Sequence, residues 1–203
     1  MHKDKGGTAI IISADEIKKT LPGYNPKASH LVHRESARIA DSNFSSILRK
    51  EMCKNIILMS GGSASGKTEY VDTFLLDEDV IIFDGTLPTL LGASIKIKKV
   101  HSVDKIVSIH AVIPDDLRRS YVAFLGRERQ YEDMHFFRTH ASSRKTLLDI
   151  AVQYPQIEII LIESSYKKDR LQFEQFLFSK RQNLIEFLKN IQYTEREIKD
   201  FVV

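Results

Sequence analysis

The stretch Gly61–Thr68 reads Gly-Gly-Ser-Ala-Ser-Gly-Lys-Thr and matches the pattern G-x-x-x-x-G-K-[ST] in full. An apolar run of strand length, Asn55–Met59, precedes it, and Thr68–Leu76 can begin a helix. Glycines let the backbone curl so that successive N–H groups point at phosphate oxygens, and the helix N-terminus adds partial positive charge. The alternative is a Gly/Ser-rich surface turn, but strand, loop and helix in this order favour a nucleoside triphosphate as the ligand.

Each position of this loop has an expected contact. Lys67 would reach the β and γ phosphates, and the Thr68 hydroxyl would ligate Mg²⁺. The residues expected to bind the nucleotide are Gly61, Gly62, Ser63, Ala64, Ser65, Gly66, Lys67 and Thr68.

The composition is that of an ordinary globular protein of 203 residues, with 42% hydrophobic and 28% charged residues. A net charge of +3 is mild, and no basic, aromatic run is dense enough to predict a nucleic-acid partner. Cys53 is the only cysteine, which excludes an internal disulfide and a cysteine-based metal site. The N-terminus lacks the apolar core of a signal peptide, and about 18 consecutive apolar residues, as a membrane span needs, occur nowhere. We expect a cytoplasmic protein without a membrane partner.

Apolar strand-like runs alternate with helix-like segments along the chain. The expected strands are 8–12, 55–59, 80–83, 106–113 and 157–162, and the longer expected helices are 29–50, 87–99, 115–129 and 141–154. Connections of this length predict parallel strands with helices on both faces. We expect one α/β domain over 1–203: residues 1–50 on the substrate side, 51–165 as nucleotide core and lid, and 166–203 as C-terminal helices packed on the core.

The C-terminal segment carries an apolar stripe at helical spacing: Phe173, Phe176, Leu177, Leu184, Phe187, Leu188 and Ile191. A helix packed on the sheet is the favoured interpretation, and a partner-binding helix is the alternative.

Acidic and hydroxyl residues follow the expected strands. Asp15 comes after the first strand, and Asp84 and Thr86 come after the third. Because ligands bind beyond the carboxyl ends of parallel strands, these groups should share a crevice with the loop. Phosphoryl transfer needs a carboxylate to orient the attacking hydroxyl, and a bound Mg²⁺. We expect Asp15 to be the general base and Asp84 to assist the metal, although either could instead be a helix N-cap.

Arginines gather on and beside a polar, aromatic stretch expected to be irregular, 128–140. Arg127, Arg129 and Arg138 are the leading candidates for cations that contact phosphate, with Arg118, Arg119 and Arg144 nearby. Such a segment is typical of a lid that closes over nucleotide and excludes water. Simple solvation is the alternative for any one of these arginines.

Several strings resemble the zeta-toxin family of small-molecule kinases. They are Asp15–Tyr24, with the pattern D-x-x-K-x-x-L-P-x-Y, the string Val32-His33-Arg34-Glu35-Ser36, the Gly61–Thr68 loop, and Asp84-Gly85-Thr86. The resemblance covers the first 90 residues well, and the remainder through element order and arginine placement. It implies a P-loop kinase-like α/β fold with a parallel sheet of about five strands.

The resemblance also implies an activity. Family members use ATP or GTP with Mg²⁺ to phosphorylate a sugar hydroxyl of UDP-N-acetylglucosamine or a related nucleotide sugar, and a small helical antitoxin is the partner of the toxins. By resemblance Asp15 is the base for that hydroxyl, and Arg127 and Arg138 clamp the transferring phosphate. The substrate wall would consist of Lys18, His33, Glu35, Ser36 and Thr86.

The order of the segments departs from the family pattern, because the D-x-x-K and V-H-x-E-S strings here precede the phosphate loop instead of following it. Contacts rather than chain order form a site, so we expect Asp15 and Lys67 to face one crevice. Arg34 also departs from the family, which often has an acidic residue there. Two alternatives stay open: a P-loop kinase for a nucleoside, cofactor or antibiotic, and a nucleotide-binding module without catalysis.

Overall fold

A mostly parallel six-stranded sheet organises the chain, whose computed structural model describes residues 8–128, 131–167 and 170–203. The strand order is β1-β3-β2-β4-β5-β6; β1 to β5 run parallel and β6 is antiparallel to β5. The strands are β1 (Ile10–Ser13), β2 (Asn55–Ser60), β3 (Ile81–Asp84), β4 (Ile106–Pro114), β5 (Glu158–Lys167) and β6 (Arg170–Phe176). The α/β class and the parallel sheet expected from the sequence are confirmed.

The central strands are apolar throughout because both of their faces are covered. In β2, Ile56 and Leu58 belong to one buried cluster, whereas Ile57 and Met59 belong to the cluster on the other face. Consecutive side chains of a strand point to opposite faces, so a strand covered on both sides needs an uninterrupted apolar run. This is why the strand before the phosphate loop is recognisable from the sequence.

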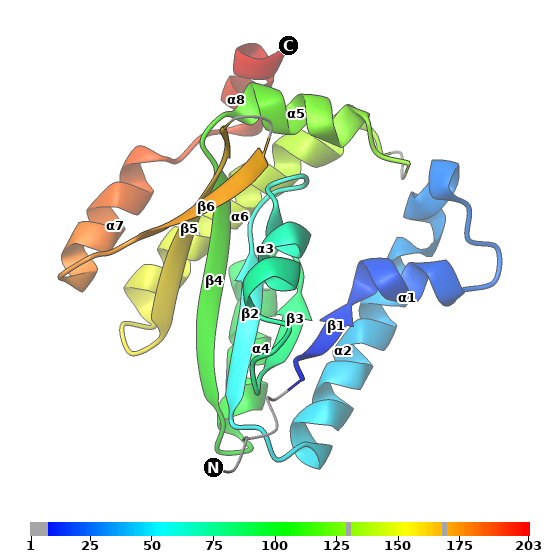
Figure 1. Ribbon diagram of the computed structural model, residues 1–203, viewed down its shortest axis with the longest axis vertical. Coiled ribbons are helices and arrows are strands. Elements are labelled where there is room, and N and C mark those ends of the chain that lie inside the picture. Colours follow the sequence, from blue (N-terminus) through cyan, green and yellow to red (C-terminus); the bar gives the residue numbers. More distant parts are fainter. Residues whose placement is uncertain (1–7, 129–130, 168–169) are drawn as a thin grey trace.

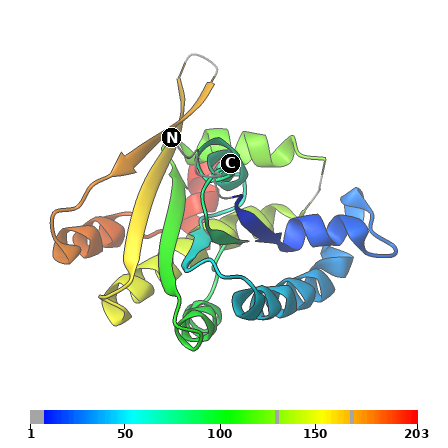
Figure 2. The ribbon, with the colours of Figure 1, turned by 60° about the horizontal axis from the view of Figure 1, so that its bottom comes forward.

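The helices cover the two faces unequally. They are α1 (Ala14–Thr20), α2 (His33–Lys50), α3 (Lys67–Phe74), α4 (Leu90–His101), α5 (Leu117–Leu125), α6 (Asp133–Gln153), α7 (Arg181–Asn190) and α8 (Glu195–Val202), with a 3-10 segment at Pro26–Val32. Residues of α2, α4, α6 and α7 share the larger core cluster with the sheet, while Val71 of α3 and its C-cap residue Leu75 belong to the smaller one. Figures 1 and 2 show α2 and α7 at opposite ends of the sheet.

The first part of the apolar stripe in the C-terminal segment forms a strand and not the expected helix. Phe173 and Phe176 lie on β6 and not on a helix, and only the later part of the stripe forms α7, which buries Leu184 and Leu188. The spacing of Phe173, Phe176 and Leu177 imitates a helical face. The alternation of Leu171 and Phe173 with polar neighbours is the period-two signal that the strand follows. The sheet therefore has six strands among the described residues instead of five.

The expected irregular stretch 128–140 is largely helical. Helix α6 begins at Asp133 and runs for 21 residues, so the non-helical part is short and Arg129 lies outside the described residues. Phe136, Phe137 and His140 are all buried. A helix buried on several sides has no clear apolar face, and its periodicity is therefore weak in the sequence.

No helix within the described ranges combines the length and the apolar character that crossing a membrane requires.

Candidate active site

The phosphate-loop residues form a tight turn between β2 and α3. Gly61 has φ 136°, and a Cβ there would lie 2.3 Å from the Val112 carbonyl oxygen; Gly66 has φ 87° and caps α3. Both positions have the positive φ that glycine adopts without strain. The strand, loop and helix arrangement expected from the motif is present, with the loop at the carboxyl end of β2.

Three neighbouring elements hold the carbonyl groups of this loop. His140 Nε2 of α6 lies 2.8 Å from the Ser63 oxygen, Ser120 Oγ of α5 donates to Ala64, and Ser164 Oγ of β5 donates to Ser65. In a trans peptide the C=O and the next N–H point in opposite directions. Holding these carbonyls against the protein therefore turns the N–H groups of residues 64–66 the other way, as an anion-binding loop requires.

The Lys67 ammonium lies within the same turn. Its Nζ donates to the carbonyls of Gly61 and Gly62 at 3.0 and 2.8 Å. Burial lowers the pKa of Lys67 to about 8; Asp84 and Asp15 act in the opposite direction, and Arg127 reinforces the lowering. These hydrogen bonds hold the Lys67 ammonium near the loop, where a phosphate would compete with the carbonyls to accept them.

Asp15 and Lys67 line one cavity of about 460 Å³, which confirms the expectation that they face a common crevice. Asp15 comes from the first turn of α1 and Lys67 from the start of α3, beyond the ends of β1 and β2. These strands are separated in the sheet only by β3, which ends at Asp84 on the same cavity. The exchanged order of the segments has not separated the carboxylate from the phosphate loop.

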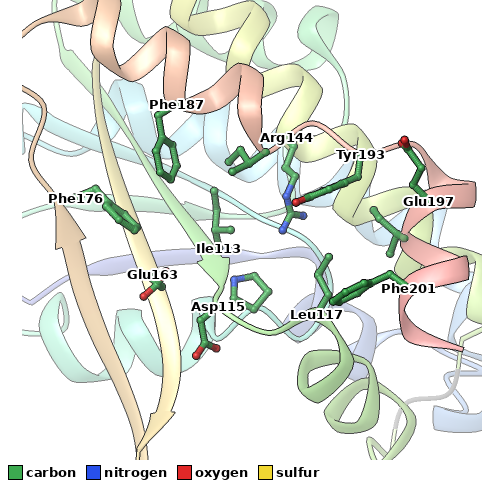
Figure 3. A pocket seen from close by; sticks show the side chains of 13 residues that line it. Ile113, Asp115, Leu117, Arg144, Glu163, Phe176, Phe187, Tyr193, Glu197 and Phe201 are labelled. Atoms are coloured by element: carbon green, nitrogen blue, oxygen red, sulfur yellow. The ribbon is translucent and has the colours of Figure 1, made fainter.

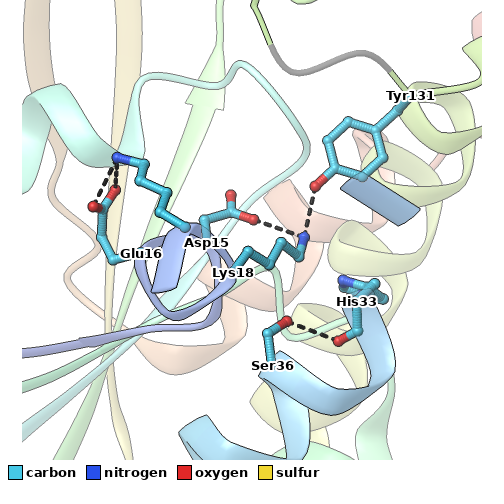
Figure 4. Close-up of polar contacts among 7 residues, drawn as sticks. Asp15, Glu16, Lys18, His33, Ser36 and Tyr131 are labelled. Atoms are coloured by element: carbon cyan, nitrogen blue, oxygen red, sulfur yellow. Dashed lines mark hydrogen bonds and ion pairs between the residues drawn. The ribbon is translucent and has the colours of Figure 1, made fainter. Parts of the chain in front are cut away.

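A buried lysine holds Asp15 in position (Figure 4). The Lys18 side chain is 1% exposed, and its Nζ donates to Asp15 Oδ1 at 2.9 Å and to the Tyr131 hydroxyl at 2.6 Å. Tyr131 lies just before α6, so Lys18 joins α1 to the segment that is expected to be the lid. Lys18 lines the cavity as expected, but its ammonium orients Asp15.

Asp15 and Asp84 are not N-caps. The N-caps of the helices that follow them are Ser13 for α1 and Thr89 for α4.

Two histidines line the cavity, His33 at the start of α2 and His135 on α6. Burial lowers the pKa of His33, and the nearby Lys18 lowers it further. Burial lowers the pKa of His135 to about 4, with His33 and Lys18 adding to the effect. The His135 ring stacks on Tyr131 with centroids 4.4 Å apart. Both imidazoles are therefore neutral near pH 7 and form polar, uncharged parts of the wall.

Only some of the candidate arginines lie at the cavity of the phosphate loop. Arg127 and Arg138 line the cavity, and Arg127 also lines an adjoining hollow of about 190 Å³ together with Arg119. Arg118 instead donates from Nε to the Phe201 carbonyl at 2.7 Å. Arg144 lies on the far side of α6 in a separate cavity. Two of the three leading cations thus reach the cavity, and Arg129 falls outside the described residues.

The hydroxyl and acidic groups expected near a metal are also present. Thr68, Asp84 and Thr86 all line the cavity. The described part of the chain contains no group of three or more His, Cys, Asp or Glu residues that could hold a metal ion by itself.

Two expected substrate residues do not reach this cavity. Glu35 is exposed on α2, and Ser36 is buried with its hydroxyl donating to the His33 carbonyl at 2.9 Å. Of the V-H-x-E-S string, only His33 lines the cavity. Ala37 and Asp41 lie one and two helical turns further along the same face and contribute the wall instead.

Several residues that hold the loop were not predicted from the sequence. Thr139 Oγ1 accepts a hydrogen bond from the Ser63 N–H at 3.0 Å, and His140 Nε2 contacts the Ser63 carbonyl. Two neighbouring residues of α6 therefore hold both backbone groups of one loop residue. These contacts join positions more than 70 residues apart in the chain. Thr139 and His140 are buried on α6, and their role depends on contacts that local sequence does not reveal.

Comparison with known proteins adds no family assignment: none of the protein-family models matches the sequence, and no curated protein is similar to it at a significant level.

Proposed function

We propose that the protein is a zeta-toxin-like kinase, which transfers the γ-phosphoryl group of ATP or GTP to a hydroxyl of UDP-N-acetylglucosamine or a related nucleotide sugar. The observation that carries the proposal is the single cavity lined by Asp15, Lys67, Arg127 and Arg138. It brings together a carboxylate, a loop of the phosphate-binding pattern and two guanidinium groups, which are the parts that phosphoryl transfer needs.

The nucleotide would lie with its phosphates in the loop. The N–H groups of residues 64–66 and the Lys67 ammonium would bind phosphate oxygens at the N-terminus of α3. The adjoining hollow shares Ala64, Ser65 and Arg127 with the main cavity and continues past Arg119 and Tyr166. It provides room for the ribose and base beyond the phosphates.

The residues present fit a magnesium ion that arrives with the nucleotide. Thr68 and Asp84 line the cavity beside the loop, and Lys67 lies close enough to Asp84 for the carboxylate to raise the lysine pKa. Mg²⁺ is commonly held by one or two protein oxygens together with phosphate oxygens and water. When bound, the ion would neutralise charge on the phosphates.

In the transfer step Asp15 would accept the proton of the acceptor hydroxyl as its oxygen forms a bond to the γ-phosphorus. The bond from that phosphorus to the bridging oxygen breaks, and the electron pair leaves with the nucleoside diphosphate. Lys67, Arg127 and Arg138 would stabilise the charge on the transferring group. The hydrogen bond from Lys18 keeps the Asp15 carboxylate at the cavity wall.

A kinase for a different hydroxyl acceptor is the second candidate. It is favoured by the position of Glu35 and Ser36 outside the cavity, because the substrate wall then lacks two groups that the resemblance implies. In the toxin interpretation, a small helical antitoxin would be the partner.

The test is product analysis by mass spectrometry after incubation with Mg²⁺, ATP or GTP, and a panel of UDP-sugars, nucleosides and other alcohols. We expect phosphorylated UDP-N-acetylglucosamine. Asp15→Asn should lower kcat by roughly 10²- to 10⁴-fold, the usual contribution of a general base. Glu16→Gln is the matched control, since Glu16 is the neighbouring exposed carboxylate of α1 and pairs with Lys19.

Unchanged turnover in Asp15→Asn would remove the proposed base. A phosphorylated product from another acceptor alone would favour the second candidate, and nucleotide binding without transfer to any acceptor would contradict both.

A further inference from the structure

A second cavity, of about 380 Å³, lies on the other side of α6 and shares no lining residue with the cavity at the phosphate loop. We call it the Arg144 cavity. It is formed by the end of β4, α5, α6, β5, β6, α7 and α8 (Figure 3). Its apolar wall includes Phe176, Phe187, Tyr193, Ile198 and Phe201. The volume falls within the range of small-molecule sites, and the aromatic lining is typical of them.

The only cationic side chain in this wall is a buried guanidinium. Arg144 is 4% exposed, and in Figure 3 its guanidinium points into the cavity beside Tyr193. One end of the group is engaged, because Nη1 lies 3.1 Å from both Nδ1 and the carbonyl oxygen of His140. Within the described residues, Nε has no hydrogen-bond partner and no carboxylate forms an ion pair with the group.

A buried guanidinium with an unsatisfied donor is costly to a protein. Isolated charges are rarely buried, and a buried donor left without an acceptor costs as much as its lost hydration. Burial lowers the pKa of Arg144 to about 10, which reflects the same cost, and Tyr193, whose ring centroid lies 5.9 Å from Cζ, opposes only part of this lowering. An anionic acceptor in the cavity would offset the cost of the buried charge by forming a strong, charge-assisted hydrogen bond with the end of the guanidinium that faces it.

The acidic residues of the wall limit the charge that such a ligand can carry. Asp115 and Glu163 lie together near the sheet, and burial, Asp115 and Glu174 raise the pKa of Glu163. Their carboxyl groups point away from the guanidinium in Figure 3. Glu197 already accepts from Thr194 N and Oγ1 at the start of α8. Asp115 and Glu197 are exposed, so water screens their charge from a group bound beside Arg144, whereas a polyanion such as a nucleotide would extend toward them. The cavity therefore suits a single negative charge next to Arg144.

We propose that the Arg144 cavity binds a small monoanion with an aromatic or branched apolar body, whose carboxylate or similar group accepts hydrogen bonds from the Arg144 guanidinium. The apolar body would lie against the aromatic side chains from β6, α7 and α8. This site is separate from the proposed kinase chemistry and does not depend on it.

The test uses three probes that share a phenyl ring on a four-carbon chain and differ in charge: 4-phenylbutanoate, 4-phenylbutan-1-ol and 4-phenylbutylamine. Each is titrated into the ¹⁵N-labelled full-length protein, and the amide shifts in ¹H–¹⁵N NMR spectra give the Kd. We expect the butanoate to bind at least about tenfold more tightly than the alcohol, the increment of a hydrogen bond to a charged group. Equal or tighter binding of the alcohol or the amine would overturn the proposal, as would no binding of the butanoate.

Variants locate the bound probe. Ile191→Trp places a larger ring in the cavity wall and should abolish binding, whereas Ile95→Trp, at a residue 47% exposed on α4, should leave the Kd unchanged. Lys67→Ala should also leave the probe Kd unchanged, because the anion is not expected at the phosphate loop. Loss of binding in Lys67→Ala, or retention in Ile191→Trp, would place the probe elsewhere and refute the site.

Arg144→Gln should remove the preference for the butanoate over the alcohol while the alcohol still binds. If this variant fails to fold because the bond to His140 is lost, the Ile191→Trp and probe-charge comparisons still decide the proposal.

Discussion

Replacing Gly62 by alanine tests the packing of the phosphate loop against α6. A Cβ at Gly62 would lie 2.3 Å from Cγ and Cδ2 of His140 and 2.4 Å from its Nδ1. Carbon atoms in contact are about 3.5–4.0 Å apart, so the ring would have to move by more than about 1 Å. The ring is fully buried and bonded on both sides, to the Ser63 carbonyl and to Arg144.

The cost follows from the two consequences of that movement. Overpacking a close-packed interior costs about 1–3 kcal/mol, and stranding a buried polar group costs about 1–3 kcal/mol more. We therefore expect Gly62→Ala to lower the free energy of unfolding by roughly 2–6 kcal/mol, a large part of the ~5–15 kcal/mol of a typical domain. The measurement is urea unfolding followed by far-UV circular dichroism.

Two comparisons isolate the mechanism. Gly126→Ala is the matched control, because a Cβ at Gly126 meets atoms no nearer than 3.6 Å and φ is −77°; its effect should stay within about 0.5 kcal/mol. In a His140→Ala background the ring is absent, and Gly62→Ala should cost much less than in the wild type. An equal cost in both backgrounds, or a cost no larger than that of Gly126→Ala, would refute the clash as the cause.

Two further predictions concern pH. Burial lowers the pKa of Lys67 to about 8, and phosphate favours the charged form of the lysine, so ATP affinity should fall about tenfold per pH unit above pH 8. Isothermal titration calorimetry at pH 7 to 9.5 measures this affinity, with Lys67→Arg as the control. An affinity that does not change with pH would contradict the prediction. Burial lowers the pKa of His110 to about 4, so the unfolded chain, with a pKa near 6.5, binds a proton that the folded chain does not between these values. His110 should therefore lower the free energy of unfolding by up to about 3 kcal/mol as the pH drops through that window. His110→Asn should reduce the slope of the free energy of unfolding against pH. A slope equal to that of the wild type would exclude His110 as its source.

The sequence predicted those parts of the fold whose signals are local. The loop pattern, the apolar strand before it and the alternation of runs with helices were enough to identify a parallel sheet covered on both faces. The position of Asp15 also followed, because residues just beyond parallel strands gather at one edge of the sheet. That rule depends on spatial neighbours and not on chain order, so it held although the first strand precedes the phosphate loop.

The predictions failed where tertiary contacts outweigh local spacing. Phe173 and Phe176 have helical spacing but pair with β5, since the open edge of that strand is available to them. Ser36 fits a family pattern, yet it lies on the inner side of α2, where its hydroxyl bonds to its own helix. Gly62 occupies a position that the loop pattern leaves free, and only the ring of His140, 78 positions later, makes a side chain there unfavourable.

One imidazole on α6, that of His140, contacts both the phosphate loop and Arg144. Because His140 Nε2 faces the Ser63 carbonyl it must carry the proton, which leaves Nδ1 to accept from Arg144. A second proton would point at the guanidinium, and burial together with Arg144 holds the pKa of His140 well below its usual range. The ring is thus neutral and in one tautomer.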